Sequence, residues 1–198
     1  MRLPVRPPLP PMLARLEREL PHDRYLYEPK WDGFRALAFR DGDAVDIRSR
    51  NDRPLARYFP ELVAGIRSLR DDAVALDGEI VVLTDGAFDF AAIMARLHPA
   101  ASRVERLRRE TPARFVAFDL LAAAGEDLRA APFVERRAAL EALAAPADGP
   151  LVVTPVTDDP KVAEGWLERF CGGGVDGVVA KHRDLVYQPG KRAMVKVK

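Results

Sequence analysis

Hydrophobic and polar residues alternate along three early stretches of the chain, Tyr25–Lys30, Phe34–Arg40 and Ala44–Arg50. A period of two residues is typical of β-strands with one buried face. Two Asp-Gly dipeptides, Asp32-Gly33 and Asp41-Gly42, separate these stretches, and this dipeptide favours tight turns. The pattern therefore predicts antiparallel strands joined by turns, with Lys30 on an otherwise largely apolar hairpin.

Helical and strand patterns follow in turn along the rest of the chain. Helices are predicted at Pro60–Arg70, Phe90–Leu97, Ser102–Glu110, Phe133–Ala144 and Lys161–Phe170, and in the short segment LARLEREL, Leu13–Leu20. Strands are predicted at Val74–Leu83, Ala113–Leu121, Leu151–Thr154, Val175–Lys181 and Ala193–Lys198. The first of these carries Asp77-Gly78, which predicts a sharp turn inside it. With no repeat and no low-complexity linker, 198 residues make one domain or two tightly joined lobes.

Composition and charge exclude several classes of protein. The net charge is +1, so a phosphate-bearing partner would be held by a local patch and not by overall charge. No apolar run is long enough to span a membrane, and the proline-rich N-terminus lacks the apolar core of a secretory signal. A single cysteine, Cys171, excludes an internal disulfide and a cysteine-based zinc cluster. These features indicate the interior of a cell.

The basic residues are divided unevenly. Only six of the 31 are lysines, and four of those lie in the last 18 residues. Arginine keeps its proton, whereas a lysine amine can lose it, so lysines in this arginine-rich chain indicate where a reactive amine is needed. Lys30 is the first candidate, because desolvation and nearby cations would favour a neutral, nucleophilic amine. The alternative is an ordinary edge-strand lysine that reaches solvent.

The residues around Lys30 carry a resemblance that decides between these readings. EPKWDGFR resembles motif I of the covalent nucleotidyltransferases, which comprise ATP-dependent DNA ligases, RNA ligases and messenger-RNA capping enzymes. Five further matches follow in the family's order: SRN (Ser49–Asn51), LDGE (Leu76–Glu79), FVAFDLL (Phe115–Leu121), VDGVVAK (Val175–Lys181) and VKVK (Val195–Lys198). The amino-acid sequences of these motifs are most similar to those of bacterial ATP-dependent ligases of the ligase C and ligase D type. The resemblance covers nearly the whole chain.

The resemblance implies an α+β, covalent nucleotidyltransferase (ATP-grasp-like) fold. Two antiparallel β-sheets flanked by helices would hold the nucleotide between them. Residues 1–198 would form the adenylation domain, with 1–23 as an N-terminal arm and short helix. The oligonucleotide-binding (OB) fold domain that follows in this family is absent, so we expect lysine adenylation and nick sealing to be weak in the isolated chain.

The resemblance also implies a reaction and its partners. Lys30 would attack the α-phosphorus of ATP and form lysyl–AMP, and the AMP would pass to the 5′-phosphate of nicked double-stranded DNA before a 3′-hydroxyl displaces it. Mg²⁺ or Mn²⁺ would offset the phosphate charge. Such an enzyme would act in DNA repair in the cytoplasm, at the nucleoid, with no membrane partner.

The same motifs imply a role for each site residue. The nucleotide would be bound by Glu28, Arg35, Glu79, Phe118, Lys181, Lys196 and Lys198, and a metal ion by Asp176 and Glu79. Glu28 would accept a hydrogen bond from the adenine amino group, Phe118 would stack on the ring, and Arg50 would meet the 5′-phosphate of the nick. Lys196 and Lys198 alternate along one strand and would face the same side.

Two departures from the family pattern affect the details of the site. Asp176 stands where the family often has glutamate, which leaves both direct and water-mediated metal contact open. Met194 stands where a tryptophan is common. Two alternative functions are compatible with the sequence. One is an RNA ligase or a GTP-using capping enzyme, and the other is a catalytically idle module that binds nucleotides or DNA ends.

Overall fold

The computed structural model describes residues 3–84, 87–97, 100–144, 149–170 and 175–198, and Cys171 lies outside them. The strands are β1 (Leu13–Leu16), β2 (Tyr25–Trp31), β3 (Phe34–Asp41), β4 (Ala44–Ser49), β5 (Ala73–Thr84), β6 (Ala87–Phe88), β7 (Ala113–Ala123), β8 (Glu126–Asp127), β9 (Leu151–Val153), β10 (Val175–His182) and β11 (Arg192–Val197). The helices are the 3₁₀ turn η1 (Ala56–Tyr58), α1 (Pro60–Arg67), α2 (Phe90–Arg96), α3 (Ala101–Glu110), α4 (Phe133–Ala144) and α5 (Pro160–Phe170). No helix among the described residues is long and apolar enough to cross a membrane.

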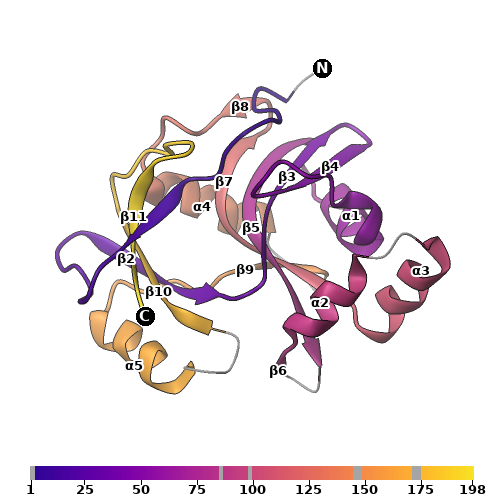
Figure 1. Cartoon of the computed structure of the whole chain (residues 1–198). Coiled ribbons are helices and arrows are strands. Elements are labelled where there is room, and N and C mark those ends of the chain that lie inside the picture. Colours follow the sequence, from indigo (N-terminus) through magenta and orange to yellow (C-terminus); the bar gives the residue numbers. More distant parts are fainter. Residues whose placement is uncertain (1–2, 85–86, 98–99, 145–148, 171–174) are drawn as a thin grey trace.

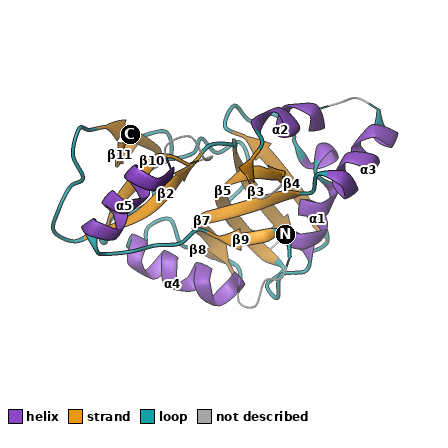
Figure 2. Ribbon diagram, turned by 90° about the horizontal axis from the view of Figure 1, so that it is seen from below, coloured by secondary structure: helices purple, strands orange, loops and turns teal. Residues whose placement is uncertain are grey.

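The strands form two sheets (Figures 1 and 2). The smaller sheet has the order β1-β11-β10-β2, and the larger has β4-β3-β5-β7-β8, with β6 beside β5 and β9 beside β7. Helix α5 packs on β10 and β2, whereas α1 and α4 pack on strands of the larger sheet. The prediction of two sheets with flanking helices is confirmed. Most pairs are antiparallel, but β1–β11 and β7–β9 are parallel.

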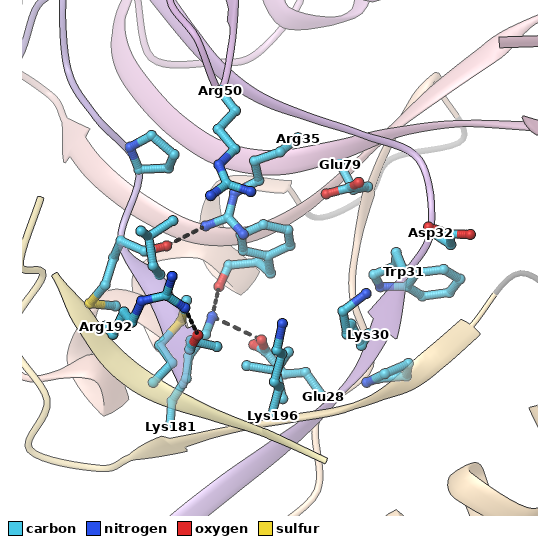
Figure 3. A pocket seen from close by; sticks show the side chains of 18 residues that line it. Glu28, Lys30, Trp31, Asp32, Arg35, Arg50, Glu79, Lys181, Arg192 and Lys196 are labelled. Atoms are coloured by element: carbon cyan, nitrogen blue, oxygen red, sulfur yellow. Dashed lines mark hydrogen bonds and ion pairs between the residues drawn. The ribbon is translucent and has the colours of Figure 1, made fainter. Parts of the chain in front are cut away.

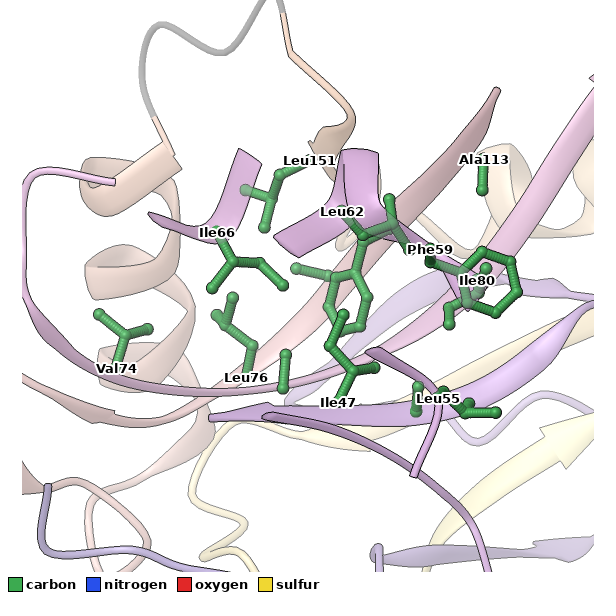
Figure 4. Close-up of a cluster of buried hydrophobic side chains, with 14 of the residues drawn as sticks. Ile47, Leu55, Phe59, Leu62, Ile66, Val74, Leu76, Ile80, Ala113 and Leu151 are labelled. Atoms are coloured by element: carbon green, nitrogen blue, oxygen red, sulfur yellow. The ribbon is translucent and has the colours of Figure 1, made fainter. Parts of the chain in front are cut away.

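Alternation along the strands of the larger sheet directs side chains to two layers. On β3, Ala36 and Ala38 belong to a core beneath α1 that also contains Leu62 and Ile66 (Figure 4). Leu37 and Phe39, between them, belong to a second core that reaches Met194 of the smaller sheet. Arg35 has the same parity as Leu37, so β3 directs it towards the space between the sheets.

The predicted hairpin at Asp32-Gly33 is wrong. Strand β2 pairs with β10 in the smaller sheet, and β3 pairs with β4 and β5 in the larger one. The chain crosses between sheets at Gly33, where a Cβ atom would lie 2.2 Å from the Ile80 carbonyl oxygen. Asp-Gly marks the bend correctly but does not say which sheet the next strand joins. The turn at Asp41-Gly42 does close the β3–β4 hairpin.

The predicted turn at Asp77-Gly78 is also wrong, because β5 runs unbroken through both residues. Glycine is required at position 78 because the neighbouring strand leaves no space for a side chain. A Cβ atom at position 78 would lie 2.4 Å from the Phe115 ring and 2.6 Å from the Val116 carbonyl oxygen on neighbouring β7. Glycine inside a strand often marks such a close approach.

The predicted helix at Leu13–Leu20 is replaced by a strand. Residues Leu13–Leu16 form β1, which pairs in parallel with β11, and the Glu17 amide continues the contact to the Lys196 carbonyl. Pairing with an otherwise open sheet edge outweighs the weak helical preference of this short segment. The other predicted helices are confirmed to within a few residues at their ends.

Candidate active site

A cavity of about 230 Å³ opens between the two sheets (Figure 3). Eight of the ten predicted site residues line it: Glu28, Lys30, Arg35, Arg50, Glu79, Phe118, Lys181 and Lys196. The other two, Asp176 and Lys198, lie beside it, where both contact each other and Asp176 contacts Lys30. Residues far apart in the sequence therefore meet at one place, as the motif series predicted.

The smaller sheet supplies one wall of the cavity through strand register. Glu28 on β2 lies opposite Val179 on β10, which in turn lies opposite Lys196 on β11. These three residues make a row across the sheet, and the residues two positions further along each strand face the same side. Lys30 and Lys181 join the cavity by this alternation.

A bulge in β10 directs Asp176 at Lys30. Val175 pairs with Trp31 and Val178 pairs with Pro29, so β10 has one residue more than β2 in this interval. Gly177 has a φ of +124°, and a Cβ there would lie 2.1 Å from the Val197 carbonyl oxygen. Both features restrict the position to glycine.

Asp176 is shared by two ammonium groups. Its Oδ2 lies 2.8 Å from Lys30 Nζ and also contacts Lys198 Nζ. Burial acts to raise the pKa of Asp176, but the hydrogen bonds from Lys198 and Lys30 outweigh it and lower the pKa. The carboxylate is thus held charged, and it fixes the Lys30 amine at the cavity wall.

A second bulge positions Phe118. Asp77 on β5 pairs with Asp119 and Gly78 pairs with Ala117, so Phe118 is the extra residue of β7. The Arg35 guanidinium lies 4.3 Å from the centre of the Phe118 ring, a distance typical of a cation–π contact. A base that stacked on that face of the ring would have to displace the guanidinium.

Arg35 is fixed by a buried network that the sequence motifs did not reveal. Its Nε and Nη2 donate to the two oxygens of Asp77 at 2.6 and 2.7 Å. The Tyr187 hydroxyl donates to Asp77 Oδ2 at 2.6 Å and accepts from the Met12 amide at 3.0 Å. Burial acts to lower the pKa of Arg35, but Asp77 outweighs it and raises the pKa.

Glu28 lies in a second buried cluster at the end of the cavity. Its Oε2 is 2.8 Å from Lys181 Nζ, and its Oε1 is 3.4 Å from Arg137 Nη1. Lys181 Nζ also donates to the Phe118 carbonyl at 2.7 Å. Burial raises the pKa of Glu28, and the two cations act against that rise.

Glu79 is a second carboxyl group of the cavity with a raised pKa. Burial raises its pKa to about 7, although Arg35 and the Gly33 amide oppose the rise. Gly33 N donates to Glu79 Oε1 at 3.1 Å. The same close crossing that requires a glycine at position 33 therefore brings a backbone donor to this carboxyl group.

A divalent cation fits this site only if substrate phosphates supply some of its ligands. Among the described residues, no three histidine, cysteine, aspartate or glutamate side chains gather as a metal cluster. Mg²⁺ is commonly held by one or two carboxylates together with substrate phosphates, and Asp176 meets that requirement at the edge of the cavity. Glu79, with its raised pKa, would be the weaker candidate ligand because protonation removes its charge.

Sequence reasoning missed several residues that build the site. Trp31 and Arg192 line the cavity, while Asp77, Tyr187 and Arg137 support its walls from behind. Asp77 stood inside the LDGE motif but was assigned to a turn. Tyr187 and Arg137 gave no local signal, because their partners lie about a hundred residues away in the sequence.

Two sheets that meet around a cavity lined by the Lys30 amine, several further cations and three carboxyl groups define a domain suited to a phosphorylated ligand. The family model described as "ATP dependent DNA ligase domain" matches residues 11–198. The chain belongs to this family.

Curated relatives and solved structures agree with that assignment. DNA ligase C of Mycobacterium tuberculosis is 52% identical over 202 residues, which cover 100% of this chain and 56% of the relative. DNA ligase C1 of Mycolicibacterium smegmatis is 48% identical over 206 residues, covering 100% and 58%. A solved structure of "mycobacterial DNA ligase D complexed with ATP and MES" superposes with a TM-score of 0.71 at 32% identity, over 96% of this chain and 60% of that one. The chain thus spans a little over half the length of these two curated relatives.

Proposed function

We propose that this chain is the nucleotide-loading part of an ATP-dependent DNA ligase and that Lys30 becomes covalently joined to AMP. One observation carries the proposal: the Lys30 amine lies on the wall of the cavity between the sheets, 2.8 Å from Asp176 and among residues from both sheets. Fixed cations around a nucleophile stabilise the charge of a phosphate that reacts there.

The first proposed step is attack of the Lys30 nitrogen on the α-phosphorus of ATP. A P–N bond forms, the bond from the α-phosphorus to its bridging oxygen breaks, and pyrophosphate leaves with the electron pair. The Lys30 ammonium must give up one proton before it attacks, and the nitrogen loses a second as the bond forms.

The later steps move AMP to DNA. An oxygen of the 5′-phosphate attacks the phosphorus of lysyl–AMP, the P–N bond breaks, and the nitrogen of Lys30 recovers its protons. The 3′-hydroxyl then attacks the phosphorus of the 5′-phosphate, AMP leaves, and the strand is joined. The relatives named as DNA ligases support DNA as the substrate; we propose nicked double-stranded DNA, acted on in the cytoplasm.

The remaining site residues receive roles from their positions. Glu28 accepts from the 6-amino group of adenine, and Phe118 packs against the ring. Arg35 and Glu79, neighbours on paired strands, hold ribose and phosphate. Arg50, whose side chain lies on the opposite side of the cavity from Lys196 (Figure 3), meets the 5′-phosphate of the nick.

The other two lysines and the metal ion concern the α-phosphate. Lys196 faces the cavity and Lys198 contacts Asp176, so both supply positive charge beside Lys30. Asp176, with Glu79 as the further carboxylate, would hold Mg²⁺ or Mn²⁺, which offsets phosphate charge when bound. We propose that an OB-fold domain, present in a longer form of the chain, completes DNA binding.

Intact-mass measurement after incubation with ATP tests the proposal. We expect an AMP-sized adduct that is lost in Lys30→Ala and kept in Lys161→Ala, since Lys161 is an exposed lysine at the start of α5. GTP should give no adduct, and labelling by GTP alone would point to a capping-type enzyme. Absence of an adduct both from the wild-type chain and from a longer chain would favour an idle binding module.

A further inference from the structure

We propose that Arg137 of α4 is a positioning residue for purine selectivity, which acts by keeping Glu28 a carboxylate oriented towards the base. The inference rests on the proposed function, in which Glu28 reads the 6-amino group of adenine. It assigns a role to a residue that lies outside the six sequence motifs and does not line the cavity.

The geometry leaves Arg137 little freedom. Its Nη1 lies 3.4 Å from Glu28 Oε1, its Nη2 donates to the Thr154 carbonyl at 2.6 Å, and its Nε donates to Glu141 Oε1 at 2.7 Å. The side chains of Arg137 and Glu28 are 7% and 3% exposed. Three partners in three directions hold the planar guanidinium in one orientation, and of the three only Glu28 lines the cavity.

The same contacts anchor the strand segment that carries Lys30. Arg137 binds the backbone carbonyl of Thr154. The side-chain hydroxyl of the same residue accepts a hydrogen bond from Trp31 Nε1 at 2.8 Å. Glu28 and Trp31, the residues two before and one after Lys30, are therefore both tied to the Arg137–Thr154 pair. Loss of Arg137 removes the contact with Glu28, whereas the hydrogen bond between Trp31 and Thr154 stays in place.

Charge explains why Glu28 needs Arg137. Two cations face the buried carboxyl group, Lys181 from β10 and Arg137 from α4, while Asp119 on β7 acts in the opposite direction. Burial favours the protonated form, and each cation favours the carboxylate. With Arg137 removed, the balance moves towards protonation, so a proton binds Glu28 at higher pH than in the wild-type chain.

Protonation would reverse what Glu28 recognises. A carboxylate accepts from the 6-amino group of adenine, whereas guanine carries a carbonyl oxygen, an acceptor, at that position. A protonated carboxyl group can donate to such an oxygen. ITP is the suitable probe, because it has the 6-oxo group without guanine's additional amino group. The charge on Glu28 thus sets the preference between ATP and ITP.

The experiment compares the rates of adduct formation with ATP and with ITP at subsaturating nucleotide, between about pH 6 and about pH 8. In Arg137→Gln, which keeps amide donors but removes the charge, we expect the ATP preference to fall by about tenfold at the acidic end. The preference should recover as the pH rises and Glu28 loses its proton. Arg137→Lys keeps a charge but cannot reach both Glu28 and Thr154, so its loss should be smaller.

Each outcome decides the inference. Arg109→Gln, at an exposed arginine of α3, is the matched control and should keep the wild-type preference. A purely structural role would lower both rates together, with no recovery at higher pH, and would overturn the inference. If Arg137→Gln does not fold, Arg137→Met, which also removes the charge, takes its place, and a wild-type preference at every pH in that variant would overturn the inference. Absence of any ATP adduct both in the wild-type chain and in a longer chain would instead refute the proposed function.

Discussion

At the scale of single residues, the Glu79 carboxyl group links stability to pH. Its pKa is raised from 4.5 to about 7 in the folded chain, chiefly by burial. The folded state therefore binds a proton more tightly than the unfolded state does. This contribution to stability is fully present below about pH 4.5 and is lost as the pH rises through about 7.

We predict that Glu79→Gln removes this dependence. The wild-type free energy of unfolding should fall, relative to that of the variant, by about 1–3 kcal/mol between about pH 5 and about pH 8. Urea unfolding of both chains at the two pH values measures the difference. Parallel pH profiles for the two chains would show that the pKa of Glu79 is not raised in the folded chain.

The sequence allowed eight of the residues that line the cavity to be predicted, but not the residues that support them. Lys30, Glu28 and Phe118 stand in short motifs, where the order of neighbouring residues carries the signal. Tyr187 and Arg137 act through partners about a hundred residues away. Such contacts depend on how the sheets are placed, which no local pattern specifies.

At the scale of elements, two β-bulges lie where the proposed chemistry takes place. One turns Asp176 towards Lys30, and the other directs Phe118 to the cavity. A bulge inserts one residue into a strand and re-aims its side chain. Regular alternation predicted these strands well, yet it could not predict the bulges, because they appear only when each strand is matched to its partner.

Gly177 should tolerate no side chain. Its φ of +124° and the 2.1 Å approach of a Cβ to the Val197 carbonyl oxygen predict that Gly177→Ala destabilises the fold by about 2 kcal/mol or more. It should also slow adduct formation, because Asp176 moves away from Lys30. Thermal or urea unfolding measures the first effect and intact mass the second.

Gly165 provides the matched control for that substitution. It lies within α5, and a Cβ there meets nothing within 4 Å. Gly165→Ala should therefore raise stability by up to about 1 kcal/mol, since alanine favours the helix. Equal effects at the two glycines would contradict the assignment of strain to the bulge.

Strand and helix assignments failed where tertiary pairing decided the outcome. The residues Leu13–Leu16 have a helical composition but complete a sheet edge beside β11. Asp32-Gly33 was predicted as a hairpin turn, whereas it carries the chain from one sheet to the other. In both places the local sequence is compatible with more than one structure, and pairing with strands distant in the sequence decides which one forms.

At the scale of the whole molecule, the Tyr187 hydroxyl ties the two sheets together behind the cavity. Tyr187 follows β10 of the smaller sheet, its partner Asp77 lies on β5 of the larger sheet, and Met12 leads into β1. Tyr187 is 4% exposed and belongs to the core that spans both sheets. The separation of the sheets, and hence the width of the cavity, is set partly by this contact.

Tyr187→Phe should loosen that connection without leaving a void. Removal of the hydroxyl leaves the buried Met12 amide without its acceptor and Asp77 with Arg35 as its remaining partner, so we expect a loss of about 1–3 kcal/mol in the free energy of unfolding. Urea unfolding measures it, with Tyr25→Phe as the control, because the Tyr25 ring packs against His182 on the outer side of the smaller sheet. Because Asp77 also fixes Arg35, the apparent KM for ATP in adduct formation should rise more than the maximal rate falls. Equal stability of the two variants would show that packing of the rings, and not the hydroxyl, holds the sheets at this distance.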